Sequence, residues 1–211
     1  MRPLILLSLA LLVAGCGTVR SSTGMLPQWS NDWRQVATDN DRKRLRDWRK
    51  AFVEGLDAAR KAGHGADITR EGALLDPDAA LTGGAIPNGA YACRTIKLGA
   101  KSTGMLDYVS YPPFACRIAQ ERDIQGFAKL SGSQRPVGLI FPGDVLRQVF
   151  LGTLVLGDER EARQYGQDET RDVAAFVERI GPNRWRIVMP RPAFESQVDV
   201  IELVPTSGGV R

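Results

Sequence analysis

The spacing of apolar residues divides the chain into a helical part and a strand-forming part. Before residue 64, apolar side chains recur at steps of three and four, which places them on one face of a helix. This apolar face consists of Leu45, Trp48, Phe52, Leu56 and Ala59. Thr38 with Asp41 is typical of a capping box that opens a helix, and Gly63 is typical of its stop. We expect an amphipathic helical segment over 29–63 that packs on a domain through its apolar face.

From residue 89 onward the period of the apolar residues changes to two. Runs rich in β-branched and aromatic residues alternate with turn residues, at the intervals typical of an all-β domain. The expected strands lie near residues 90–98, 109–119, 124–130, 136–141, 146–156, 171–180, 184–190 and 197–204. Their short connections favour an antiparallel meander, and eight such strands close a small barrel or fold into a sandwich. We predict a mainly β fold with an N-terminal α-helical segment, and favour a closed, lipocalin-like barrel over a sandwich.

The remaining segments are polar or rich in glycine and proline. Residues 16–28 are small and polar and read as a flexible tether. Residues 64–88 read as a connector with one helical turn near 78–81, which leads into the barrel domain over 89–205. A short flexible tail is expected over 206–211.

The N-terminus carries a short apolar run from Pro3 to Ala14 that follows Arg2 and ends before Cys16. The run is about twelve residues long, whereas a helix needs about twenty to cross a bilayer. It resembles a bacterial lipoprotein signal, which implies cleavage of residues 1–15 and lipidation of Cys16, with palmitate among the acyl chains. An ordinary secretory signal and a buried helix with a chance cysteine are the alternatives.

Lipidation would place the protein in the bacterial envelope. Gly17 follows the cysteine in place of aspartate, which in lipoproteins of this kind implies the outer membrane, with the folded part facing the periplasm. The net charge of +4 is concentrated in the basic run over 42–50, which favours a solvated helix face, with contact with anionic headgroups as the alternative. We expect no nucleic-acid partner, because the chain is expected to be exported and no recognition motif accompanies the basic run.

The two other cysteines, Cys93 and Cys116, form an even pair, which in an exported protein indicates a disulfide. If the strands around them form an antiparallel hairpin, its midpoint falls near Gly104, inside a turn-like stretch. No metal site is expected, since the chain has one histidine and no Cys-x-x-Cys spacing. No cofactor is expected either.

Two groups of polar residues are candidates for ligand binding. Arg94 and Arg117 each follow a cysteine and would be neighbours across the hairpin, where they would hold a carboxylate or phosphate in a cavity or lie outside beside acidic groups. Ser133, Gln134 and Arg135 lie between two expected strands, in a recognition loop at the barrel mouth or in a plain hairpin turn.

Sequence motifs for catalysis are absent. There is no Gly-x-Ser-x-Gly elbow, no His-Glu-x-x-His and no phosphate-binding glycine loop, so no catalytic residue is assigned. A carboxylate pair remains open because the separation of Asp and Glu in space is invisible in the sequence. Its candidates are Glu178, Glu195 and Glu202.

Much of the chain resembles a family of proteobacterial envelope lipoproteins, the domain-of-unknown-function family 4893. The matching pieces are Gly89 to Gly99, Phe114 to Arg117, Lys129, Gly132 to Arg135, Phe150 to Gly152, Glu178 with Arg179, Arg184 to Arg186, Pro190, and Leu45 with Trp48 in the helix. The resemblance implies the extent of the domain, and it brings no activity, ligand or catalytic residue.

These observations favour a non-catalytic, lipid-anchored binding module for a small or acyl-bearing envelope molecule. The alternatives are an interaction or scaffold protein for envelope machinery and an envelope hydrolase with paired carboxylates. The expected partners are the membrane, through Cys16 and with help from the basic helix, and a small molecule or a protein of the envelope.

Overall fold

The computed structural model describes residues 30–206. The predicted signal peptide, Cys16, the tether and all but the first residue of the predicted tail lie outside the described residues. The helical elements are α1 (Trp33–Val36), α2 (Asp39–Arg46), α3 (Trp48–Lys61), α4 (Gly65–Glu71) and the 3₁₀ helix η1 (Gly72–Leu74). The strands are β1 (Gly89–Ala100), β2 (Tyr108–Ser110), β3 (Phe114–Glu121), β4 (Ile124–Lys129), β5 (Gln134–Phe141), β6 (Arg147–Leu156), β7 (Asp172–Gly181), β8 (Arg184–Pro190) and β9 (Ser196–Pro205).

The strands form a closed antiparallel barrel, as predicted. Each strand from β3 to β9 pairs with the next, and β1 closes the ring because it pairs with both β3 and β9. The barrel has eight strands, and β2 is an additional short strand that pairs only with the end of β1. We predicted one strand over 109–119, but Pro112 and Pro113 interrupt it, since proline has no backbone N–H to donate to a neighbouring strand.

The predicted amphipathic helix is present but divided at Asp47 into α2 and α3. Hydrogen bonds from Asp47 N to the Lys43 carbonyl (3.1 Å) and from Ala51 N to the Asp47 carbonyl (3.0 Å) cross the junction. At the start of α2, the Thr38 side chain accepts a hydrogen bond from Asp41 N (3.2 Å), as the capping motif predicted. None of the described helices is both long enough and apolar enough to span a membrane.

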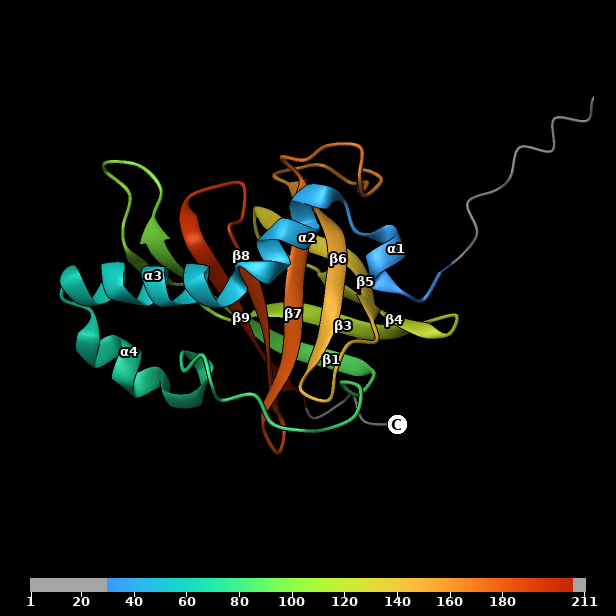
Figure 1. Cartoon of the computed structure of the whole chain (residues 1–211), viewed down its shortest axis with the longest axis horizontal. Helices are drawn as coiled ribbons and strands as arrows, with labels where there is room; N and C mark the ends of the chain where they lie inside the picture. Colours follow the sequence, from blue (N-terminus) through green and yellow to red (C-terminus); the bar gives the residue numbers. More distant parts are fainter. Residues whose placement is uncertain (1–29, 207–211) are drawn as a thin grey trace, which may run out of the picture.

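The helices cover one outer side of the barrel (Figure 1). The buried side chains Phe52 and Leu56 of α3 pack on apolar residues that point outward from β1, β8 and β9. Leu45 of α2 packs beside β6 and β7 in the same way. The apolar face identified in the sequence therefore lies between the helices and the barrel wall.

The segment that we expected to be a connector is partly helical. It contains α4 and η1 between residues 65 and 74, whereas the single turn was expected near 78–81. A helix this short has one buried apolar position, Ile68, so no helical periodicity is visible in its sequence. Ile68, Leu74 and Leu75 pack beneath α3 and bring the chain back to the barrel.

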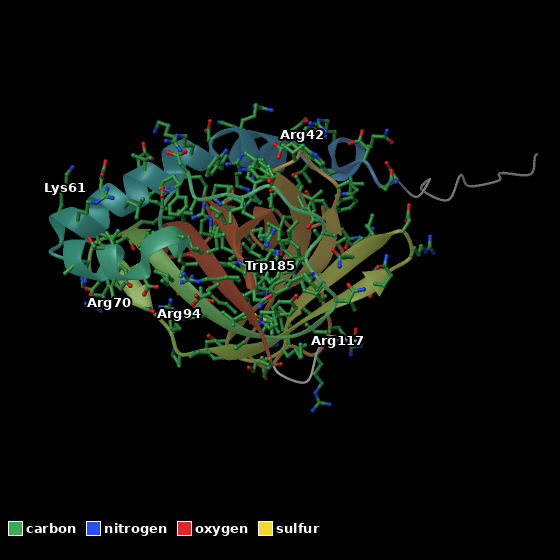
Figure 2. All side chains as sticks on the ribbon, turned by 90° about the horizontal axis from the view of Figure 1, so that it is seen from below. Arg42, Lys61, Arg70, Arg94, Arg117 and Trp185 are labelled. Atoms are coloured by element: carbon green, nitrogen blue, oxygen red, sulfur yellow. A yellow bond between two sulfur atoms is a disulfide. The ribbon has the colours of Figure 1, made fainter. Side chains whose placement is uncertain are left out.

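Side chains fill most of the barrel interior. Phe127 and Phe150 meet edge to face with ring centroids 5.6 Å apart, and Tyr91 and Trp185 meet in the same way at 6.2 Å. Trp185 lies within the ring of strands in Figure 2. The interior is a packed apolar core over this length, with Gln125 bonded to the Ile86 carbonyl (2.7 Å) near one end and charged residues at the other.

Candidate mouth cavity

The inward-facing residues of β1 change from apolar to polar along the strand. Tyr91 and Cys93 belong to the apolar core, and Thr95 and Lys97 follow on the same face of the strand because side chains alternate. Thr95 and Lys97 are both buried. The polar end of the barrel is therefore the end at which β1 finishes.

A cavity of about 100 Å³ opens at this polar end, and we call it the mouth cavity. It is lined by Thr95, Lys97, Tyr111, Phe114, Lys129, Ser133, Gln134 and Glu195. Strands β1 and β3 separate at this end of the barrel. Their pairing stops at Cys93 opposite Phe114, and β1 then pairs with β2. A second cavity of about 30 Å³ adjoins it and shares Thr95, Lys129 and Gln134.

Lys97 is neutralised by two carboxylates, that of Glu195 in the mouth cavity and that of Asp199, which lines the adjoining smaller cavity. Its Nζ lies 2.7 Å from Asp199 Oδ2 and 3.2 Å from Glu195 Oε2, and it donates to Gln134 Oε1 at 3.1 Å. Burial lowers the pKa of Lys97, but the two carboxylates outweigh burial, so its pKa is raised above the ordinary value. Burial also raises the pKa of Asp199, which accepts a further hydrogen bond from Ser196.

Lys129 is the second buried ammonium of the cavity, and no carboxylate of the described residues lies within ion-pair distance of it. Its Nζ donates to the carbonyls of Ser131 (3.0 Å) and Gln134 (2.9 Å) and lies 4.0 Å from the centre of the Phe114 ring. Burial, reinforced by the positive charges of Arg135 and Lys97, lowers the pKa of Lys129 to about 8. The ammonium is hydrogen-bonded, but no carboxylate of the described residues contacts it directly.

Gly132 allows Lys129 and Phe114 to approach the β4–β5 turn. A Cβ at this position would lie 2.7 Å from Lys129 Nζ and 3.2 Å from the Phe114 ring, and the backbone φ of +92° also favours glycine. The glycine of this predicted loop therefore supports the cavity wall.

Glu195 reaches the cavity from the loop between β8 and β9. Besides Lys97, it accepts a hydrogen bond from Gln134 Nε2 at 3.2 Å. Its side chain is 39% exposed, whereas Asp199 is buried. Its backbone φ of +68° is unusual for a residue with a side chain. Glu195 is thus the exposed and conformationally strained member of the cluster.

The predicted loop residues occupy two different positions. Ser133 and Gln134 line the mouth cavity. Arg135 instead donates to the carbonyls of Gly132 (2.7 Å), Gly157 (2.6 Å) and Glu159 (2.7 Å), and so ties two neighbouring loops together. Its guanidinium contributes positive charge beside Lys129 but does not line the cavity.

Arg94 and Arg117 lie on the outside of the barrel and are not neighbours. Arg117 lies opposite Ala90 in the β1–β3 pairing, and its side chain extends away from the barrel in Figure 2. Arg94 binds Glu71 of α4 and Glu202 of β9, with Nη1 2.7 Å from Glu71 Oε1 and Nε 2.9 Å from Glu202 Oε2. Arg94 therefore attaches α4 to the barrel, in the outward arrangement that was the alternative to a pocket.

The two cysteines lie next to each other in the apolar interior. The Cα atoms of Cys93 and Cys116 are 5.9 Å apart and their sulfur atoms are at disulfide distance. Cys116 lies opposite Tyr91 and Cys93 opposite Phe114, so the β1–β3 register is centred near Gly104, as the sequence predicted. The pair joins these two strands just before the point where they separate.

The three glutamates considered for a carboxylate pair are dispersed. Glu178 is fully buried beneath the helices with Arg186 (2.6 Å) and Arg147 (2.6 Å), and Glu202 lies on the outer wall with Arg94. Only Glu195 faces the mouth cavity. Among residues 30–206, no group of His, Cys, Asp and Glu is arranged to hold a metal ion.

Sequence reasoning missed Lys97, Lys129 and Asp199 as site residues. The position of Lys97 along its strand could have identified it. Lys97 lies four residues after Cys93, so the two side chains point to the same face of the strand. Lys129 likewise shares a face with Phe127, and Asp199 with Ile201. A charged residue on the buried phase of a strand is unusual enough to mark a site.

Comparisons with known proteins identify one family. The model of the family described as Domain of unknown function (DUF4893) matches residues 33–203, which include the helices, all but the last two residues of the barrel and every residue of the mouth cavity. No curated protein and no solved structure matches the chain.

Proposed function

The chain belongs to the DUF4893 family, and we propose that it acts as a non-catalytic binding module whose ligand is a small polar molecule held in the mouth cavity. The observation that carries this proposal is the mouth cavity itself. It is lined by buried charged side chains of a kind that folded proteins seldom enclose without a partner or a function.

The packed interior narrows the choice of ligand. Aromatic and aliphatic side chains occupy the barrel beyond the cavity, so the described interior offers no channel for an acyl chain. A water molecule takes about 30 Å³ in the liquid, so a cavity of about 100 Å³ holds only a few non-hydrogen atoms. The ligand, or the part of it that enters, is therefore small. We favour a small molecule over an acyl-bearing molecule as the ligand.

We further propose that lipidated Cys16 anchors the module to the outer membrane, facing the periplasm. The basic helix adds little to this anchor, because several of its cations are already paired. Arg42, Arg44, Arg49 and Lys50 form ion pairs with Asp39, Asp41, Asp78 and Glu54. Lys43 and Arg46 form no such pair with the described residues and are exposed.

Native mass spectrometry of the protein taken from its own envelope tests the binding function. We expect a fraction of the protein to carry a small adduct that is lost in a Gln134→Ala variant and retained in an Arg117→Ala variant, whose side chain lies outside the cavity. An adduct retained by Gln134→Ala, or no adduct at all, contradicts the proposal. Crosslinking to one stoichiometric protein partner, with an empty cavity, would favour a scaffold instead.

Labelling with radioactive palmitate tests the anchor separately. We expect label on the wild-type protein and its recovery with outer membranes, and loss of both in a Cys16→Ser variant. A Cys16→Ser variant that keeps its label and its membrane association contradicts lipidation at this residue.

A further inference from the structure

We propose that the mouth cavity recognises a carboxylate and that Glu195 occupies the place of this carboxylate until a ligand displaces it. The inference rests on the proposed binding function and names its ligand class. Three features of the described residues support it: the charge balance of the cavity, the exposure of Glu195, and the donors that Glu195 uses.

The charge balance shows that the cavity needs one exchangeable anion. Lys97 and Lys129 bring two positive charges, and Asp199 supplies one buried negative charge 2.7 Å from Lys97. Glu195 supplies the second negative charge and brings the cluster to neutrality. If Glu195 turns outward, one positive charge is left in a buried site, and an entering carboxylate restores the balance.

Glu195 is the anion that can leave. Its side chain is 39% exposed, so it can reach solvent without disturbing the core, whereas Asp199 is enclosed by Lys97 and Ser196. The backbone of Glu195 lies in the left-handed region, at φ +68°, which is costly for a residue with a Cβ. The Glu195 backbone is held there by the hydrogen bond from Lys101 N to its carbonyl (2.9 Å), and its side chain is held by Lys97 and Gln134.

The donors that hold Glu195 would serve a ligand equally well. Lys97 Nζ and Gln134 Nε2 each lie 3.2 Å from a separate oxygen of its carboxylate. When Glu195 leaves, these two donors remain in the wall of the cavity, and Lys129 adds positive charge beside them. Because the free volume is about 100 Å³, the cavity holds a carboxylate group with only a few further atoms.

Titration with sodium acetate tests the inference on the full-length protein, with sodium chloride at matched ionic strength and methyl acetate as references. Binding is followed by the NMR signals of the Gln134 side-chain amide. We expect acetate alone to shift these signals saturably. In Glu195→Gln the affinity for acetate should rise about tenfold, because the internal competitor loses its charge.

Two further variants test the charge balance. Lys129→Met should lower the acetate affinity of the wild type about tenfold, and Glu195→Gln combined with Lys129→Met should return it close to the wild-type value. Glu161→Gln, which removes an exposed carboxylate on another loop, should leave it unchanged. Thermal unfolding of each variant verifies that it is folded.

The outcomes separate this inference from the binding function. If acetate shifts the Gln134 signals in neither the wild type nor Glu195→Gln, or if chloride shifts them equally, the carboxylate inference is overturned. An uncharged adduct in native mass spectrometry would overturn it as well, while leaving the binding function in place. Specific acetate binding by a protein that carries no adduct in its envelope would support the site and contradict the native binding role.

Discussion

The two ends of the barrel interior are formed by the same strands, but one end is lined mainly by apolar side chains and the other by polar and charged ones. Toward one end, β1 contributes Tyr91 and Cys93 to a core in which aromatic rings pack edge to face. Toward the other, the same face contributes Thr95 and Lys97, which line the mouth cavity. The apolar end satisfies its residues by packing, whereas the polar end encloses a charge, that of Lys129, without a counter-ion. Under the proposed function, the apolar end supplies stability and the polar end accepts the ligand.

The largest expected effect comes from the apolar end. Phe150→Ala removes a fully buried ring that packs on Phe127, and should lower the free energy of unfolding by about 3–5 kcal/mol. The matched change at the mouth, Ser133→Ala, should alter it by less than about 0.5 kcal/mol. Urea denaturation measures both. Similar losses of unfolding free energy for the two variants would contradict the claim that the apolar end contributes more to stability than the mouth.

Removal of the cysteine pair should be the next largest effect. The two cysteines are 23 positions apart, and closing a loop of this length contributes about 3 kcal/mol in the chain-entropy model. Cys93→Ala with Cys116→Ala should therefore unfold at lower urea, while acetate affinity changes less than twofold. Equal stability of the oxidised and reduced wild-type protein would show that the pair is not bonded.

The next effect is a dependence of stability on pH, caused by Lys129 in the mouth cavity. The pKa of Lys129 is lowered to about 8 in the folded protein, against about 10.4 in an unfolded chain. Between these values the unfolded chain binds more protons on this residue, so its contribution to stability rises with pH. The groups that face it are Lys97 from β1, Arg135 from β5 and Glu195 from the opposite loop.

Comparison with Lys129→Met isolates this contribution from those of other titrating groups. From pH 7 to pH 9.5, the free energy of unfolding of the wild type should increase relative to the variant by about 2 kcal/mol. Urea denaturation at the two pH values measures the change. A difference between the two proteins that stays constant with pH would mean that Lys129 titrates as an ordinary surface lysine.

The smallest effect concerns the backbone at Glu195. Both Glu195→Gly and Glu195→Ala remove the carboxylate, but only glycine adopts the observed φ of +68° without strain. We expect the glycine variant to be more stable than the alanine variant by about 1 kcal/mol, the reverse of the usual order. An alanine variant that is equally or more stable would remove the argument that Glu195 is held against its backbone preference.

The fold was predictable because periodicity in the strands is strong and their connections are short. The closed barrel, the apolar helix face and the β1–β3 register near Gly104 all followed from local pattern. What could not be predicted depends on distant residues. The short helix α4 forms against α3 and has too few apolar positions for a period. The break between β2 and β3 has a local signal, Pro112 and Pro113, which was absorbed into one longer expected strand.

The candidate site was predictable only in part. Ser133 and Gln134 were found because their loop carries hydrogen-bonding groups next to a glycine. Arg94 was misleading, because its partner Glu71 comes from the helix that the sequence did not reveal. Lys97 and Lys129 were overlooked because a lysine near the end of a strand is usually solvated. Their phase places them on the same strand faces as Cys93 and Phe127, and the closed barrel makes those faces the buried ones.

The most direct test of the account is the pKa of the Lys129 side chain, measured by NMR through its Cε and Nζ signals in the presence and absence of acetate. The account predicts a pKa near 8 in the free protein, and in Glu195→Gln, where the internal carboxylate has lost its charge, a clear rise when acetate supplies the missing negative charge. A pKa that stays at the ordinary lysine value of about 10.4 and does not respond to acetate would contradict it.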